Sequence, residues 1–273
     1  MAAKLDMGRA WNEAVASISA NRDMVLIVAG VFFLLPNLML SLLVPGAAQP
    51  PTMPAGGEDN MDQMMAQMSA WIGDVWWMYA AIAVAQAVGS LALLALLTDR
   101  DRPTVGEAIG LGVKALPTYL ATQIIVSLAI GIAGGTGLLL AQVSPLLGVL
   151  LVLLVMIFAL YAMLKILLVT PVIAIEKEMN PVAALRRSWR LTKGNSLLIL
   201  AFFLLLGVAF VVISLVVGLV LAAFSLLGED VGLIVGGIGN GMVSTALVTV
   251  MIAALAAVHR QLAAGNQVAE TFG

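Results

Sequence analysis

The sequence predicts an all-α integral membrane protein whose six transmembrane helices form three hairpins, each preceded by a cytoplasmic amphipathic helix. The first observation is composition: 62% of the 273 residues are hydrophobic and 10% are charged, whereas a soluble domain carries about 25% charged residues. The second is length, because runs of roughly 20 apolar residues recur and each can cross a hydrocarbon core about 30 Å thick. The third is that the basic residues other than Lys165 lie in the terminal segments and in alternate connections. Residues 1–273 are therefore expected to form a single transmembrane domain.

The N-terminal segment, residues 1–23, mixes polar residues with apolar residues at helical spacing, which is typical of an amphipathic helix at the membrane interface. A cleaved signal peptide is the alternative, but its charged region would be too long ahead of the apolar run. The first span follows at about residues 24–44 and contains Pro36 and Asn37.

The remaining spans are separated by polar segments. Residues 45–60 hold four prolines and three glycines and cannot continue a helix. A methionine-rich stretch, 61–72, then has the spacing of an ordinary apolar helix face, with a copper(I) site through thioether ligands as the alternative. The spans that follow are expected at about 75–97, 118–141, 146–175, 196–226 and 232–258. Short amphipathic helices at 104–116 and 181–193 precede the third and fifth spans, as residues 8–20 precede the first.

Orientation follows from the distribution of basic residues. The connections 45–74, 142–145 and 227–231 contain no Lys or Arg. The basic residues lie on the other side of the spans: Lys4, Arg9, Arg22, Arg100, Arg102, Lys114, Lys177, Arg186, Arg187, Arg190, Lys193 and Arg260. By the positive-inside rule, both termini are expected to be cytoplasmic, and the protein is expected in the cell (inner) membrane.

The densest basic cluster is in the helix at 181–193. Asn180 is a typical N-cap and Pro181 a typical first helical residue, and Gly194-Asn195 is a plausible stop. Val182, Leu185 and Trp189 are expected on one face, and Arg186, Arg187, Arg190 and Lys193 on the other. A basic residue near an anionic membrane surface contributes about 1 kcal/mol to binding. This helix is interpreted either as a topological anchor or as a specific site for a phospholipid, a phosphate-bearing substrate or a partner.

Lys165 lies inside the fourth apolar run. A charge at the bilayer centre costs roughly 2.5–3.5 kcal/mol on insertion scales, so the residue requires an explanation. If Pro171 kinks or ends the helix, Lys165 lies near the interface and its side chain snorkels to the polar region. The alternative is a polar cavity or a contact with a lipid phosphate.

The sequence contains no recognisable catalytic constellation. His259 is the only histidine and lies at the end of the sixth span, there are no cysteines, and no phosphate-binding loop or intramembrane acidic pair is present. We therefore expect no catalytic residues, no metal site, no cofactor and no nucleic-acid partner. Glycines cluster in the third span (131–137) and the sixth (232–241), which favours close helix packing within the bundle, with self-association as the alternative.

One segment also carries a family resemblance. Its residues are Lys165, Pro171, Glu176, Pro181, the run Ala184 to Trp189, Leu191, and Lys193-Gly194. This pattern resembles the membrane domain of glycerophosphoryl diester phosphodiesterases and the YciC-like inner-membrane proteins. In fused members a separate barrel carries the chemistry, and this chain lacks that barrel, so the catalytic activity is not carried over. The resemblance implies a lipid- or glycerophosphate-related role in the membrane.

These observations lead us to expect a non-enzymatic membrane protein that binds or translocates a lipid-like or phosphate-bearing molecule, with anionic membrane lipids as partners. The expected ligand-binding residues are Lys165, Glu176, Arg186, Arg187, Ser188, Trp189, Arg190 and Lys193. The alternative is a scaffold or accessory subunit whose glycine faces and surface helices dock a protein partner or a second copy of the chain.

Overall fold

The computed structural model of the protein describes residues 4–44, 46, 59–98, 103–224, 226 and 228–272. In these ranges six helical stretches are long and apolar enough to cross a membrane: Arg22–Leu42, Gln63–Thr98, Val105–Val143, Leu146–Ile175, Ser196–Phe224 and Val231–Ala264. The predicted all-α, six-span class is confirmed, and the protein is a polytopic helical membrane protein.

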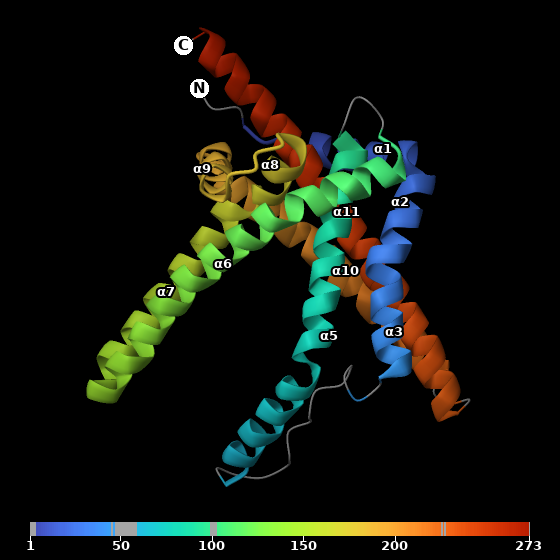
Figure 1. The fold of residues 1–273 in the computed structure, drawn as a ribbon, viewed down its shortest axis with the longest axis vertical. Helices are drawn as coiled ribbons and strands as arrows, with labels where there is room; N and C mark the ends of the chain where they lie inside the picture. The colour runs from blue at the N-terminus through green and yellow to red at the C-terminus, as the bar shows by residue number, and fades with distance from the viewer. Residues whose placement is uncertain are drawn as a thin grey trace.

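The elements, in chain order, are α1 (Met7–Ala20), α2 (Arg22–Ala29), the π-helix η1 (Gly30–Leu34), α3 (Leu35–Leu43), α5 (Asp59–Thr98), α6 (Val105–Val143), α7 (Pro145–Ile166), α8 (Val169–Ile175), α9 (Pro181–Thr192), α10 (Ser196–Phe224) and α11 (Glu229–Phe272). The short helices α1, α8 and α9 gather at one end, where the C-terminal end of α11 also lies (Figure 1). The long helices extend from there, and the α6–α7 hairpin diverges from the α10–α11 hairpin (Figure 1).

The first span is not a uniform α-helix, because α2 passes through η1 into α3. A proline has no amide hydrogen, and its ring clashes with the carbonyl four residues earlier, which for Pro36 belongs to Phe32. A π-helical turn widens the backbone at this point, and the Asn37 Nδ2 donates to the Phe33 carbonyl oxygen at 2.7 Å. Gly89 of α5 accommodates the widened turn, since a Cβ at this position would clash with the Phe32 side chain.

Several predicted boundaries differ from the observed ones. The amphipathic helix expected at 104–116 is not separate: Thr104 and Glu107 form a capping box that starts α6, and the helix continues through Pro117 to Val143. The predicted 61–72 segment is likewise continuous with the second span in α5, although the side chains at 59–62 lie outside the described part. The polar tail after the sixth span extends α11. At 1.5 Å per residue these helices are each about 58–66 Å long, roughly twice the hydrocarbon thickness.

Tertiary packing is concentrated at the end that carries the basic residues. The buried core includes Ala10 and Ala14 of α1, residues 91–97 of α5, Ala108 and Ala115 of α6, Val172 and Ile173 of α8, Ala184 and Leu191 of α9, and residues 252–254 and 256–258 of α11. Away from this end the helices are largely uncovered: only 6% of the most apolar window of α6, and the same share for α7, is buried inside the protein. Such exposure is stable in lipid, where apolar side chains need no protein cover.

Candidate functional site

The helix α9 begins and ends where the sequence predicts. The Asn180 side chain accepts hydrogen bonds from the amides of Val182 and Ala183, at 3.0 and 3.2 Å, and Pro181 is the first helical residue. Gly194 has a φ of 85°, a backbone conformation that favours glycine, and it turns the chain into α10. The predicted N-cap, start and stop are confirmed.

The side chains of α9 form three faces rather than the predicted two. The face that sequence reasoning missed is small and packs inward: Ala184, Ser188, Leu191 and Thr192 are buried. An apolar flank with Val182 and Trp189 is exposed, and so are the basic residues Arg186, Arg190 and Lys193. Arg187 does not share their exposure, because it is turned inward on the other flank. The four basic residues therefore do not act as one surface.

Ser188 fixes α9 against the end of α7. Its hydroxyl donates to the Lys165 carbonyl oxygen at 2.7 Å, in a buried environment. The α7 helix ends at Ile166, so the Lys165 carbonyl is among the last four that lack a partner within the helix. The serine satisfies this acceptor and positions α9 across the break between α7 and α8. Ser188 therefore has a structural role, because its hydrogen bond to the Lys165 carbonyl oxygen attaches α9 to the end of α7.

The side chain of Lys165 is enclosed between two aromatic rings. Its Nζ lies 5.4 Å from the centroid of the Tyr161 ring and 5.8 Å from that of Trp189, and the residue is only 3% exposed. Both distances are within the range of cation–π attraction, which contributes about 0.5–2 kcal/mol. Among the described residues, no carboxylate forms an ion pair with this ammonium group. The lysine is covered by protein rather than extended along an open surface, as free snorkelling requires.

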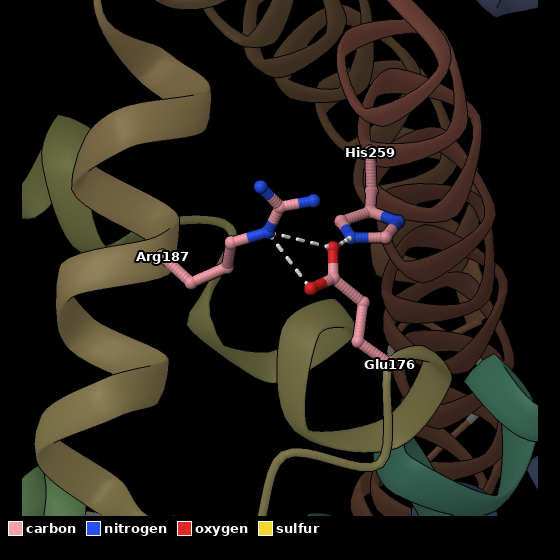
Figure 2. Close-up of polar contacts among 3 residues, drawn as sticks. All are labelled: Glu176, Arg187 and His259. Atoms are coloured by element: carbon pink, nitrogen blue, oxygen red, sulfur yellow. Dashed lines mark hydrogen bonds and ion pairs between the residues drawn. The ribbon is translucent and has the colours of Figure 1, made fainter. Parts of the chain in front are cut away.

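Glu176, Arg187 and His259 form a compact charge cluster (Figure 2). Arg187 Nε is 2.8 Å from Glu176 Oε2 and 3.2 Å from Oε1, and His259 Nε2 is 2.9 Å from Oε1. The glutamate follows the last residue of α8, the arginine belongs to α9 and the histidine to α11. The side chains are 26%, 21% and 3% exposed, respectively. One carboxylate therefore connects three elements that are distant in sequence.

The electrostatics of the cluster favour an ionised carboxylate. Partial burial of Glu176 raises its pKa, but the hydrogen bonds from His259 and Arg187, together with the Arg187 charge, outweigh this effect and lower the pKa to about 2. The carboxylate is consequently ionised throughout the neutral range. It compensates the Arg187 guanidinium and accepts a hydrogen bond from His259 Nε2.

The structure divides the predicted ligand residues into separate environments. Successive residues of an α-helix are rotated by about 100°, so Trp189 and Arg187 point to different flanks of α9. Lys165 lies against Trp189, whereas Arg187 lies against Glu176. No contact among the described residues therefore joins Lys165 and the arginines of α9 in one anion-binding site. His259 was expected at the end of the sixth span, and the fold brings it to Glu176.

A pocket of about 1240 Å³ opens beside the charge cluster. Glu176, Arg187 and His259 line one part of it, and the rest comes from the N-terminal segment, α1 and the ends of α5 and α11. Its further charged residues are Lys4, Asp6, Arg9, Glu13 and Arg260. The pocket is therefore polar and lies at the packed, basic end of the protein.

No family model matches the chain, and neither does any curated protein or solved structure. The fold and the site consequently define one class, a six-span helical membrane protein with a charged pocket at its basic end.

Proposed function

We propose that this protein is a non-enzymatic component of the cell (inner) membrane, with both termini in the cytoplasm, that binds phosphate head groups of anionic lipids through α9. The observation that carries this proposal is the exposure of Arg186, Arg190 and Lys193 beside the exposed Val182 and Trp189. Cations next to apolar and aromatic side chains are what an interfacial helix presents to head groups and acyl chains. The neutralised Arg187 is assigned a structural role instead.

Lys165 supports the proposal by positioning Trp189. The ammonium group lies against the rings of Tyr161 and Trp189, and the two rings pack edge to face with centroids 5.7 Å apart. This arrangement holds the tryptophan at the apolar border of α9. The resemblance of residues 165–194 to glycerophosphoryl diester phosphodiesterase membrane domains also supports a lipid-related role.

Native mass spectrometry of the protein, extracted from membranes in mild detergent, tests the proposal. We expect anionic phospholipid to be retained by the natural protein and strongly depleted in the triple variant Arg186→Gln, Arg190→Gln, Lys193→Gln. A double variant, Arg22→Gln with Lys114→Gln, removes two cations of the same end outside α9 and is expected to retain the lipid. Equal retention in all three proteins would exclude α9 as the lipid site.

Docking of a protein partner or a second copy within the membrane is the second candidate function. It is favoured by Gly131, Gly134 and Gly135 of α6, because a Cβ at any of them would meet nothing within 4 Å. The predicted close packing within the chain is therefore not observed at these glycines, although Gly137 contacts Val152 of α7. A stoichiometric protein or a dimer recovered after cross-linking, with no specific lipid, would favour this function over lipid binding.

A further inference from the structure

The pocket beside the charge cluster contains cations that no carboxylate neutralises. Arg9 Nε is 2.7 Å from Glu13 Oε1, and Arg187 is paired with Glu176. Lys4 and Arg260 also line the pocket, but neither forms an ion pair with a described acidic residue. Arg260 Nη1 instead donates to the Leu97 carbonyl oxygen at 3.4 Å. Four Lys or Arg residues and three carboxylates, Asp6 among them, line the pocket, which leaves an excess of one positive charge.

Residues that line the same pocket also carry buried polar atoms without hydrogen-bond partners. In the described part of the chain, five buried side-chain nitrogen or oxygen atoms have no hydrogen-bond partner, and four belong to pocket-lining residues. These four are Thr98 Oγ1, His259 Nδ1, Arg260 Nε and Gln261 Nε2. An unpartnered buried polar group costs about 1–3 kcal/mol, so their concentration around one pocket requires a cause.

Most of these unpartnered atoms are hydrogen-bond donors. Gln261 Oε1 accepts from the Asp6 backbone amide at 3.3 Å, which leaves the amide nitrogen as the unpartnered end. Arg260 Nε is a donor only, and the Thr98 hydroxyl can donate. His259 Nε2 faces the Glu176 carboxylate, so Nδ1 is the ring nitrogen left without a partner. A ligand with several acceptor oxygens and negative charge suits this pocket.

We infer that this pocket binds a phosphate group, carried by a soluble phosphate ester or by a lipid head group, with Arg260 and Lys4 as its counter-charges. A phosphate ester offers three acceptor oxygens and a charge of about −1.5 to −2 at pH 7 for the two cations, whereas a carboxylate has two oxygens and a single charge. The volume of about 1240 Å³ also accommodates an organic group larger than the phosphate. The inference does not depend on the proposed lipid contacts of α9, because no residue of that exposed surface lines the pocket.

The test compares the purified full-length protein in inorganic phosphate and in chloride at equal ionic strength and pH. A ligand that binds only the folded protein raises the Tm with concentration, and we expect phosphate to do so for the natural protein. Arg260→Gln and Lys4→Gln should each weaken the apparent phosphate affinity at least tenfold. Lys114→Gln, which removes an exposed lysine of α6 that lies outside both the pocket and the proposed lipid contacts of α9, should leave it unchanged.

A second arm identifies the source of the phosphate. The same proteins are reconstituted in nanodiscs of phosphatidylcholine with or without phosphatidylglycerol, and glycerol 3-phosphate is titrated in the absence of the anionic lipid. Stabilisation by glycerol 3-phosphate that depends on Arg260 identifies a soluble ester, and stabilisation only by phosphatidylglycerol, with the same dependence, identifies a head group. If Arg260→Gln does not fold, Lys4→Gln, an exposed position before the first helix, decides the test.

Two results would overturn the inference. One is the absence of stabilisation by phosphate, glycerol 3-phosphate and phosphatidylglycerol alike. The other is stabilisation that Lys4→Gln and Arg260→Gln leave intact, or that Lys114→Gln removes equally, because the anion would then bind elsewhere. Loss of lipid retention in the α9 triple variant with intact phosphate binding would separate this site from the proposed function.

Discussion

Glu176 is the residue whose single side chain connects the most distant parts of the sequence. Its carboxylate accepts from Arg187 of α9 and His259 of α11. Removing one partner of such a pair leaves the others without compensation, which costs more than the pair itself contributes. The cluster therefore specifies how α8, α9 and α11 are arranged relative to one another.

The lowered pKa of Glu176 predicts acid sensitivity. Its pKa is about 2 in the folded protein against an ordinary 4.5, so the stabilisation is fully present above about pH 4.5 and is lost as the pH falls towards 2. We expect the Tm in detergent to fall over this interval. Glu176→Gln should have a lower Tm at pH 7 and a flatter profile between pH 5 and 3.

The matched control for this prediction is Glu13→Gln. The N···O distance between Arg9 and Glu13 is 2.7 Å, close to the 2.8 Å between Arg187 and Glu176, but the Arg9 side chain is 70% exposed. Exposed pairs four residues apart on a helix contribute about 0.3–0.5 kcal/mol, so this variant should remain close to the natural protein at pH 7. If the two variants have the same Tm and the same acid profile, the stabilising role of the cluster is refuted.

Ser188→Ala should weaken the attachment of α9. The substitution removes the buried donor to the Lys165 carbonyl oxygen, and an unsatisfied buried acceptor costs about 1–3 kcal/mol. We expect a Tm several degrees lower and faster proteolysis of the 176–180 connection. Ser19→Ala is the control, since that hydroxyl is exposed and bonds only to carbonyls of its own helix. Equal effects of both substitutions would contradict the proposed anchoring.

At the scale of elements, the packing of α5 against α6 depends on backbone approach. A Cβ on Gly112 of α6 would lie 2.7 Å from the Val88 carbonyl oxygen of α5. Backbone cannot move aside as a flexible side chain can, so the helix pair must separate to admit even a methyl group. This glycine lies at the packed end of the protein, where α5 and α6 contribute to the core.

Gly112→Ala and Gly110→Ala therefore form an informative pair in one helix. We expect Gly112→Ala to lower the Tm, by a free-energy change on the order of 1–3 kcal/mol, because of overpacking. Gly110 has nothing within 4 Å of the position of a Cβ, so Gly110→Ala should be neutral or stabilising by up to about 1 kcal/mol. Thermal unfolding of both variants in the same detergent measures the difference. A more stable Gly112→Ala would show that α5 and α6 do not approach closely at this glycine.

At the scale of the whole molecule, one end is packed and charged and the other ends of the hairpins diverge (Figure 1). In water such divergence would expose apolar helices at a large cost, whereas lipid solvates them. The burial of the short helices α1, α8 and α9 with the ends of the long helices creates the pocket. Ligand binding is consequently expected at this end.

The predicted orientation can be tested by single-cysteine labelling, because the natural chain contains no cysteine. Lys193→Cys should react with a membrane-impermeant maleimide only after the cells are opened, and Gly46→Cys should react in intact cells. The expectation rests on the confinement of Lys and Arg to one side. Labelling of Lys193→Cys in intact cells would reverse the topology and place the pocket outside.

The sequence by itself determined the class, the number of spans and the limits of α9, because these follow from apolar length and local capping by Asn180 and Gly194. Local signals could not determine where helices continue: the capping box at Thr104 starts a helix, but lipid and neighbouring helices allow it to pass Pro117. Glu176 and Ser188 were predicted as site residues only from the family resemblance, which does not indicate the residues that they contact.

Only the tertiary structure decided which charges meet. Arg187 and His259 are 72 positions apart in the printed sequence, and their shared contact with Glu176 exists because α8, α9 and α11 converge. The same convergence pairs Lys165 with aromatic rings rather than with the arginines. It also gathers Lys4, Arg260 and the unpartnered donors around one pocket. Periodicity assigns a residue to a face of its own helix, whereas its neighbours on other helices depend on how the helices pack.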